Sequence, residues 1–337
     1  MNAMSYSSGL EALKRALKDV DRILISTHVN PDGDAVGSVL GLRGILQLIG
    51  KQAEVVISDS ITKKYQFLID KPVLKPDSPE LENLEESDRF QMVILVDASE
   101  RDRVGNVLDH LDRWMTPGAL EVNIDHHISN DIFGDIVIVD PERASSAELV
   151  LQLAEALDVD LTPVIADQLF AAILTDTGRF QFGNTDSRSL HAAAKLVTEG
   201  ADPSTITQRI YMERPASFYR LLGNLLSSIE LYHDGRTCVM TMTTDVVATY
   251  FPDGTMDSEG IVDFTTQIEG VKVGIFIRQT GDGAFKASLR SRGEIDIRKV
   301  VETFGGGGHE NAAGCGIEGS LDEVTELLVS EVEKWLK

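Results

Sequence analysis

Short apolar runs alternate with segments of helical periodicity from residue 22 to about residue 176. Five runs have the length and composition of buried strands: Ile23–Ser26, Ala53–Ile57, Met92–Val96, Glu121–Ile124 and Ile136–Val139. Between the first two, Asp34–Leu48 has the apolar spacing of a largely buried helix, and Ser145–Asp176 predicts two more helices. Short continuous apolar strands joined by helices predict an α/β fold with a doubly wound, mostly parallel sheet.

The pattern changes after residue 185, where Asp186–Glu230 predicts three consecutive helices. Strands are then expected at Thr237–Thr243, Val271–Ile277 and Ala284–Arg290, and helices at Ser227–Leu231, Ile297–Phe304 and Leu321–Leu336. A chain of 337 residues is long enough for two domains. We therefore predict an α/β domain over residues 1–185, a helical linker over 186–217 and a smaller α+β domain over 218–337.

Composition narrows the class of protein. Hydrophobic residues make up 42% of the chain and charged residues 25%, as in ordinary globular proteins. No apolar run approaches the roughly 20 residues that cross a bilayer, so we expect no membrane association. Cys238 and Cys315 are the only cysteines, which excludes a disulfide framework and indicates a reducing, cytoplasmic location.

The net charge of −23, from 31 basic and 54 acidic residues, restricts the partners of the chain. A protein with this charge should not bind long duplex DNA by neutralising its phosphates. It can still bind a short anionic substrate if metal ions and a local basic patch supply the positive potential.

Charged side chains stand directly after the apolar runs. They are His28, Asp32 and Asp34 after R-I-L-I-S-T, Asp97 after M-V-I-L-V, Asp125, His126 and His127 after L-E-V-N-I, and Asp176 after A-A-I-L-T. Open α/β sheets bind ligands at the carboxyl ends of their strands. Because four such groups occur in one chain, together they predict a two-metal phosphoesterase site.

The first two groups have competing interpretations. The histidine and aspartates of H-V-N-P-D-G-D suit Mn²⁺, Mg²⁺ or Zn²⁺, although Asn, Pro, Asp and Gly also form ordinary turns. Asp97 ends a strand, where a carboxylate is unfavourable unless it is paired or coordinated. It could bridge two metals with its two oxygens, or cap the residues that follow it.

The last two groups complete the predicted site. Adjacent histidines after a strand cannot face the same way, so one of His126 and His127 would bind metal and the other the substrate phosphate. Asp125 would orient a histidine. Asp176 is interpreted as the last ligand, because two metals about 3.5–4 Å apart need several carboxylates. The alternative for Asp125–His127 is a solvated loop with two ordinary histidines. The alternative for Asp176 is an ordinary loop residue.

A glycine run in the second domain is a candidate anion site. In F-G-G-G-G-H-E-N-A-A-G, the backbone N–H groups of Gly306, Gly307 and Gly308 could converge on an anion, and His309 adds a donor. Arg290 lies nearby in residues 278–299, which hold six basic and three acidic residues. The alternatives are a flexible linker and a solvated strand face.

These motifs together resemble the DHH phosphoesterase family, named for the triplet seen at Asp125–His127. The resemblance includes H-x-N-P-D-G-D-A-x-G-S at His28–Ser38, T-D-T-G-x-F at Thr175–Phe180 and the G-G-G-H-x-x-A-A-G loop of the DHH-associated C-terminal domain. It covers nearly the whole chain. It implies a catalytic domain over residues 1–185, a substrate-binding domain over 218–337 and an active site in the cleft between them. In length and domain order the chain is most similar to the stand-alone nanoRNase (oligoribonuclease)/pAp phosphatase type.

The resemblance implies roles for individual residues. One Mn²⁺ would be held by His28, Asp32 and Asp97, and the second by Asp34, Asp97, His126 and Asp176. It also implies that His127 contacts the scissile phosphate, and that Gly306–His309 and Arg290 hold the far end of a short nucleotide chain. Arg103 would also reach a substrate phosphate. As catalytic residues we predict Asp97, Asp125, His126 and His127. The resemblance favours a homodimer.

The predicted reaction is metal-assisted hydrolysis of a phosphoester. The expected substrates are short single-stranded RNA, hydrolysed to mononucleotides, and 3′-phosphoadenosine 5′-phosphate (pAp), which would lose its 3′-phosphate. Two Mn²⁺ are the expected cofactors, with Mg²⁺ or Zn²⁺ as alternatives. A rival hypothesis with the same chemistry is a phosphodiesterase for cyclic di-AMP or its linear product pApA. A rival from another class is a non-catalytic nucleotide-binding regulator, against which the intact ligand motifs argue.

Overall fold

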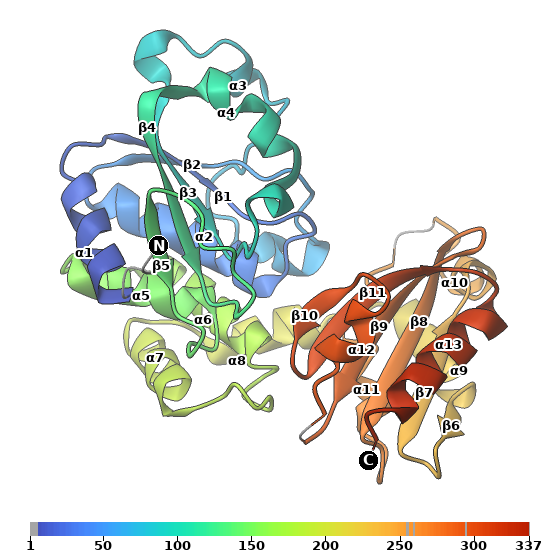
Figure 1. Ribbon diagram of the computed structural model, residues 1–337. Coiled ribbons are helices and arrows are strands. Elements are labelled where there is room, and N and C mark those ends of the chain that lie inside the picture. Colours follow the sequence, from blue (N-terminus) through green and yellow to red (C-terminus); the bar gives the residue numbers. More distant parts are fainter. Residues whose placement is uncertain (1–5, 254–255, 259, 294, 337) are drawn as a thin grey trace. The chain divides into compact units, whose positions relative to one another are not determined.

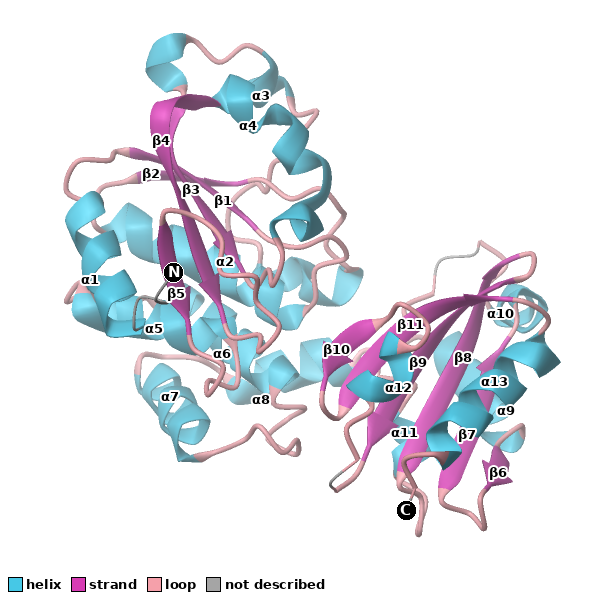
Figure 2. Ribbon diagram, in the orientation of Figure 1, coloured by secondary structure: helices cyan, strands magenta, loops and turns pink. Residues whose placement is uncertain are grey.

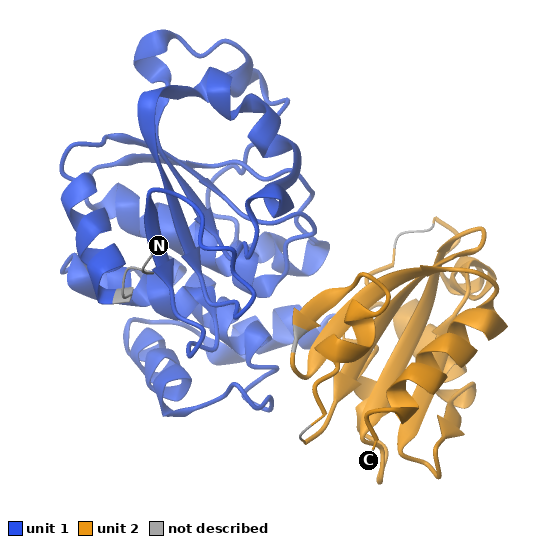
Figure 3. Cartoon of the chain, in the orientation of Figure 1, with its two compact units in different colours: residues 1–213 blue, residues 214–337 orange. Residues whose placement is uncertain are grey.

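The computed structural model describes residues 6–253, 256–258, 260–293 and 295–336 (Figure 1). The chain divides into two compact units, Met1–Glu213 and Arg214–Lys337 (Figure 3). In the described parts of both units, no helix is long and apolar enough to cross a membrane. Each unit has its own sheet and its own core, and the two are described separately.

Unit 1 is built on a five-stranded parallel sheet with the strand order β2-β1-β3-β4-β5 (Figure 2). The strands are β1 (Arg22–Ser26), β2 (Gln52–Val55), β3 (Phe90–Val96), β4 (Met115–Asp125) and β5 (Ile136–Val139). The chain leaves β1 toward β2 on one side and returns to β3 on the other. The carboxyl ends of β1 and β3 therefore form the switch point at which doubly wound sheets bind their ligands.

Helices cover both faces of this sheet. One face packs against α1 (Tyr6–Ala16), α2 (Gly33–Leu48), α5 (Ser146–Ala156) and α6 (Pro163–Asp176). The other packs against α3 (Pro79–Glu82), the 3₁₀ helix η3 (Arg101–His110) and α4 (Leu111–Trp114). The strands are apolar at consecutive positions because both of their faces are buried. Unit 1 also contains η1 (Lys63–Leu68), η2 (Glu86–Asp88), α7 (Ser187–Thr198), α8 (Pro203–Thr207) and the π-helical turn η4 (Gln208–Met212).

Helices α2 and α6 run antiparallel in close contact along a line of glycines on α2. A Cβ atom added to any of these glycines would lie less than 3.0 Å from α6: Gly33 from Thr175, Gly37 from Gln168, Gly41 from Leu169 and Gly44 from Ile165. Without side chains there, the two backbones approach more closely than ordinary helix packing allows. The contact brings the first turn of α2 and the last turn of α6 to the same end of the unit.

Unit 2 is built on a six-stranded mixed sheet with the order β10-β11-β9-β8-β7-β6. The strands are β6 (Glu230–Tyr232), β7 (Thr237–Met242), β8 (Val273–Gly281), β9 (Ala284–Ser291), β10 (Gly307–His309) and β11 (Ala312–Glu318). One face packs against α12 (Arg298–Glu302) and α13 (Leu321–Glu333). The opposite face packs against α9 (Ala216–Ser227). Helix α10 (Thr244–Tyr250) contacts α9, and α11 (Asp263–Thr266) contacts β7, β8 and β9. The predicted α/β fold with a second, smaller α+β unit is confirmed.

Two local predictions for unit 2 differ from the structure. The helix predicted at Ser227–Leu231 is wrong: α9 ends at Ser227, and Glu230–Tyr232 forms edge strand β6 against β7. A run this short carries too little periodicity to distinguish a helix end from an edge strand. The glycine run is not an open loop, since Gly307–His309 forms edge strand β10 against β11. A Cβ at Gly308 would lie less than 3.0 Å from the Ala312 carbonyl oxygen, so close backbone approach requires glycine there.

Candidate active site

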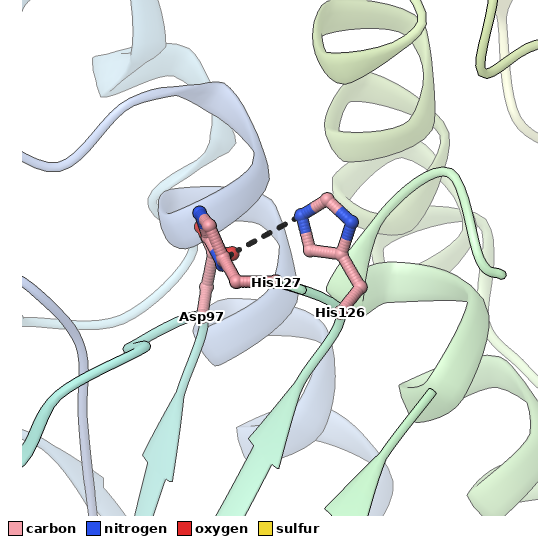
Figure 4. Close-up of side chains that lie close together, drawn as sticks. All are labelled: Asp97, His126 and His127. Carbon is pink, nitrogen blue, oxygen red and sulfur yellow. Dashed lines mark ion pairs between the residues drawn. The ribbon is translucent and has the colours of Figure 1, made fainter. Parts of the chain in front are cut away.

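The predicted ligands of unit 1 meet at the carboxyl edge of the parallel sheet. His28 follows β1, Asp97 follows β3, and Asp125 ends β4 directly before His126 and His127. Figure 4 shows Asp97 and the two histidines close together beyond the ends of these strands. Asp34 lies in the first turn of α2 and Asp176 in the last turn of α6, which the glycine-lined contact brings to the same end. Asp32 caps the start of α2 by accepting a hydrogen bond from the Ala35 N–H.

Asp97 lies at the centre of this cluster. Its Oδ2 is 3.5 Å from His28 Nε2, and its Oδ1 is 3.6 Å from His126 Nε2 and 3.7 Å from His127 Nδ1. The alternative capping role is excluded, because η3 begins at Arg101 with Glu100 as its cap residue. Asp97 has a left-handed backbone (φ 58°), and its N–H donates to the Ile124 carbonyl. Such strained conformations concentrate at functional sites.

Three overlapping groups of three ligand atoms have the spacing of metal sites, and the ligand atoms of each group lie within 4.8 Å of one another. The first group is His28, Asp32 and Asp97, the second is Asp34, His126 and Asp176, and the third is Asp97, His126 and His127. In the second group His126 Nε2 is 3.7 Å from Asp34 Oδ2 and 3.6 Å from Asp176 Oδ2. Atoms bound about 2.0–2.2 Å from one cation are separated by about 3–4 Å. The structure thus brings all six predicted ligands together, and their binding of metal stays a prediction.

The carboxylates destabilise one another's ionised form. Burial, then the charge of Asp97, raises the pKa of Asp34 well above its usual value. Burial and the charges of Asp32 and Asp97 do the same to the pKa of Asp176. Burial would also raise the pKa of Asp97, but its hydrogen bond with His28 and the nearby histidine charges outweigh burial and lower it. A divalent cation would offset this repulsion, and the mixture of imidazole and carboxylate fits Mn²⁺, Mg²⁺ or Zn²⁺.

Backbone carbonyls fix the tautomers of two histidines. His28 Nδ1 donates to the Val29 carbonyl at 2.8 Å, and His126 Nδ1 to the Arg143 carbonyl at 3.2 Å. A carbonyl only accepts, so each Nδ1 carries a proton and each Nε2 faces the carboxylates. This second contact of a histidine is the usual way in which proteins orient metal-binding imidazoles.

His127 is held differently, by a carboxylate. Its Nδ1 is 2.6 Å from Asp125 Oδ1, and Asp125 Oδ2 accepts a hydrogen bond from Asn130 Nδ2 at 2.6 Å. Burial alone would lower the pKa of His127, but the Asp125 contact and the charge of Asp97 raise it to about 10. The neighbouring carboxylates therefore favour the protonated form of His127, while Asp125 and Asn130 fix its ring.

Helix α5 contributes contacts that the sequence did not reveal. The N–H groups of Ser146 and Ala147 donate to Asp34 at 2.7 and 3.2 Å, and Ser146 Oγ donates to Asp97 Oδ1 at 3.1 Å. Ser38 Oγ also donates to Asp34. The segment Ser145–Glu148 shows the S-x-x-E pattern of a helix start, which could have predicted where α5 begins. It could not have predicted contacts to residues far away in the sequence.

Replacing Ser146 by alanine should weaken metal binding while the fold is kept. The variant loses the Oγ contact that orients Asp97 but keeps the N–H bond to Asp34. Loss of such an orienting contact lowers metal affinity by about 10–100-fold. Calorimetric titration of the metal-stripped protein with Mn²⁺ measures this change. Ser204→Ala, in the first turn of α8, is the control, and an unchanged affinity in Ser146→Ala would contradict the orienting role.

Asp176→Asn should affect the metal-free and metal-loaded proteins in opposite directions. The raised pKa of Asp176 means that its ionised form weakens the metal-free fold above the unfolded pKa. At pH 8 the substitution should raise the metal-free Tm, by about 2–4 °C for each kcal/mol of repulsion removed. It should also abolish the further rise in Tm produced by Mn²⁺. Calorimetry with and without Mn²⁺ measures both changes in Tm, with exposed Asp160→Asn as the control. A lower metal-free Tm in Asp176→Asn would show that Asp176 is not repelled by its neighbours.

The predicted substrate-binding residues lie in both units. Arg103 is exposed in η3, and its carbonyl accepts a 2.7 Å hydrogen bond from the Val29 N–H, so it is tied to the loop that carries His28. In unit 2, Arg290 of β9 and His309 of β10 both pair with Ala312 of β11, which places them in one row across the sheet. Arg290 Nε lies 3.3 Å from Asp263 Oδ1. The side chain of His309 lies outside the described residues.

A parallel α/β sheet with histidines and aspartates gathered at its carboxyl edge is the arrangement expected of a metal-dependent hydrolase. Residues 22–173 match the DHH family N-terminal domain, and residues 244–337 match the DHHA1 domain. With these two matches and the relatives below, the chain belongs to the DHH family of phosphoesterases and is a hydrolase acting on phosphoester bonds.

Several relatives match almost the entire chain. The bifunctional oligoribonuclease and PAP phosphatase NrnA of Thermus thermophilus is 34% identical over 98% of this chain and 95% of that protein. The cyclic-di-AMP phosphodiesterase PdeA of Listeria monocytogenes is 28% identical over 97% of this chain but only 50% of its own length. The crystal structure of an exopolyphosphatase-related protein from Bacteroides fragilis has a TM-score of 0.87 at 26% identity, covering 98% of this chain and 96% of that one.

Proposed function

We propose that the protein hydrolyses short oligoribonucleotides to mononucleotides and removes the 3′-phosphate from pAp, with Mn²⁺ as its metal. The observation that carries this proposal is the full-length match to the bifunctional oligoribonuclease and PAP phosphatase of Thermus thermophilus, 34% identical over 98% of the chain. The gathering of six candidate ligands at one edge of the sheet supports it, because hydrolysis of phosphoesters by two metals needs such a set.

The proposed ligand sets follow the first two of the three groups in the structure. His28, Asp32 and Asp97 would hold one cation, and Asp34, His126 and Asp176 the other, with Asp97 shared between them. When bound, the two cations supply a water of lowered pKa and offset negative charge on the phosphoryl oxygens. The roles of Ser146 and the two backbone carbonyls are to keep these side chains in place before the substrate arrives.

His127 is proposed as the donor to the scissile phosphate. The contact with Asp125 raises the pKa of His127 and so favours its protonated form, and Asp125 holds the ring from the Nδ1 side. A cationic donor that is already oriented stabilises charge that develops on a phosphoryl oxygen without reorganising during the reaction. Exposed Arg103, tied to the His28 loop, would add positive charge for the phosphates of the substrate.

Unit 2 is proposed to bind the part of the substrate that does not react. Edge strand β10 leaves one row of its backbone groups without a strand partner, and Arg290 lies in the same row of the sheet as His309. His309→Ala should therefore raise KM for five-nucleotide RNA but spare a generic small phosphodiester. Steady-state kinetics on both substrates, with exposed His191→Ala as control, measures this. If His309→Ala raised KM equally for both substrates, His309 would not act specifically on the longer substrate.

The first test is a time course with Mn²⁺ on 5′-labelled RNA of five nucleotides, with pAp and cyclic di-AMP in parallel. Stepwise shortening of the RNA together with phosphate release from pAp is the expected result. Faster conversion of cyclic di-AMP would favour the alternative, for which the match to PdeA over 97% of this chain is the specific support. If the RNA and both nucleotides stay intact, the proposed function is wrong.

A further inference from the structure

An aromatic ring stands exposed in the turn that follows the candidate metal ligand Asp176. The side chain of Phe182 is 39% exposed. Its ring lies against Gly178, where an added Cβ would be 2.5–2.6 Å from three ring carbons. Gly178 follows Asp176 by two residues, so the two Cα atoms are at most about 7.6 Å apart, given 3.8 Å per step. One side of the ring is therefore covered by backbone next to the site.

The segment that carries Phe182 is firmly held. The Thr177 carbonyl accepts the N–H groups of both Gln181 and Phe182 at 3.0 Å. Asn184 Nδ2 donates to the carbonyls of Asp176 and Ala144 at 3.0 and 3.3 Å. These bonds fold the chain back onto the end of α6, so the ring has a fixed place relative to Asp176.

The backbone of this turn is also strained. Gly178, Arg179 and Phe180 are consecutive left-handed residues, with φ of 54°, 64° and 61°. Arg179 and Phe180 carry Cβ atoms, for which this conformation is unfavourable, and such strain persists chiefly where function requires it. The turn directs Phe180 inward, 6.3 Å edge-on to Phe170 of α6. Phe180 thus anchors the turn to the core, so Phe182 is not needed for that anchoring.

We propose that Phe182 is a stacking platform for a nucleobase of the substrate, next to the scissile phosphate. The inference rests on the proposed function and extends it to how a base is recognised. Every base has a π-face, so an aromatic platform holds short RNA of any sequence. A single exposed apolar side chain is common on protein surfaces. Phe182 differs from such residues because its ring lies against Gly178, two residues after Asp176, in a strained turn whose backbone is held by Asn184.

The test compares Phe182→Ala and Phe182→Trp on two matched substrates. One is pApA, and the other is the same dinucleotide with hydrogen in place of each base. Phe182→Ala should lower kcat/KM for pApA by about 5- to 150-fold, which is the range for loss of one base stack, whereas Phe182→Trp should retain it. The loss should be confined to the substrate that carries bases. Leu190→Ala, which removes another exposed apolar side chain on α7, should lower neither rate.

A binding measurement separates this inference from the proposed function. The fluorescence of a 2-aminopurine dinucleotide should be quenched by the unmodified protein and by Phe182→Trp, but not by Phe182→Ala. The rise in Tm on adding Mn²⁺ should be equal in all variants, which shows that the metal ligands are undisturbed. Equal losses on both dinucleotides, or unchanged quenching in Phe182→Ala, would overturn the stacking role. If the unmodified protein hydrolyses neither RNA nor pAp, the proposed function fails, and the quenching result alone decides on Phe182.

Discussion

Asp97→Asn should abolish turnover while unit 1 stays folded. Asp97 has contacts to three histidines and is the one carboxylate that both proposed ligand sets share. Asparagine has nearly the same size as aspartate. It lacks the negative charge and the second anionic oxygen that a carboxylate uses to bridge two cations. Loss of several kcal/mol of electrostatic stabilisation corresponds to a rate at least about 10³-fold lower. Steady-state rates on pApA and pAp with Mn²⁺ measure the change.

Asparagine is the suitable replacement because of the left-handed backbone at this position. Asn tolerates positive φ better than Ala does, so loss of activity is not confounded by backbone strain. Asp158→Asn is a matched control: it is another aspartate with positive φ (55°), exposed in the loop after α5. The control should keep full activity. Near-normal rates in Asp97→Asn would exclude a bridging carboxylate, and with it the two-metal arrangement.

Gly37→Val should lower the stability of unit 1 and weaken metal binding at the same time. The added Cβ would lie less than 3.0 Å from the Gln168 carbonyl oxygen, in the middle of the α2–α6 contact, and backbone cannot move aside as a side chain can. Overpacking of this kind destabilises by about 1–3 kcal/mol or more, which corresponds to about 2–4 °C in Tm per kcal/mol. Because the two helices carry Asp34 and Asp176, their separation should also reduce Mn²⁺ affinity.

Gly223→Val tests whether the lower stability expected of Gly37→Val comes from the α2–α6 contact or simply from placing valine in a helix. Gly223 lies within α9, and nothing lies within 4 Å of a Cβ built on it. Valine is slightly better than glycine inside a helix, so the control should keep or slightly raise Tm. Thermal unfolding of both variants, followed by Mn²⁺ titration, measures the two effects. A Gly37→Val protein as stable as Gly223→Val would show that the helices can separate freely.

The sequence predicted the fold class and the position of every candidate ligand in unit 1. It did so because each of His28, Asp97 and Asp125 follows an apolar run, and parallel strands end at one edge of a sheet. The roles of these residues in binding metal are still predictions. The left-handed backbone of Asp97 left no local signal, since aspartate is common in many conformations.

What the sequence missed depends on long-range or backbone contacts. Ser146 reaches Asp34 across 112 residues, and a single chain carries no signal for such a pairing. The sequence did not reveal that Gly307–His309 forms a strand, with Gly308 close against the backbone of β11, and its predicted role in binding an anion stays a prediction. At Ser227–Leu231, pairing of β6 with β7 decided between strand and helix, which no local pattern determines.

The order in which the ligands occur along the chain determines when the site can form during translation. His28 is made first, but Asp176 closes the ligand set and lies at the end of α6. At about 5–20 residues per second, the 148 residues from His28 to Asp176 take roughly 7–30 seconds to synthesise. Until then a nascent chain lacks one carboxylate of the second proposed ligand set, however much of its sheet has formed. Under the proposed function, a nascent chain that has not yet reached Asp176 therefore has no complete centre with which to cleave the RNA around it.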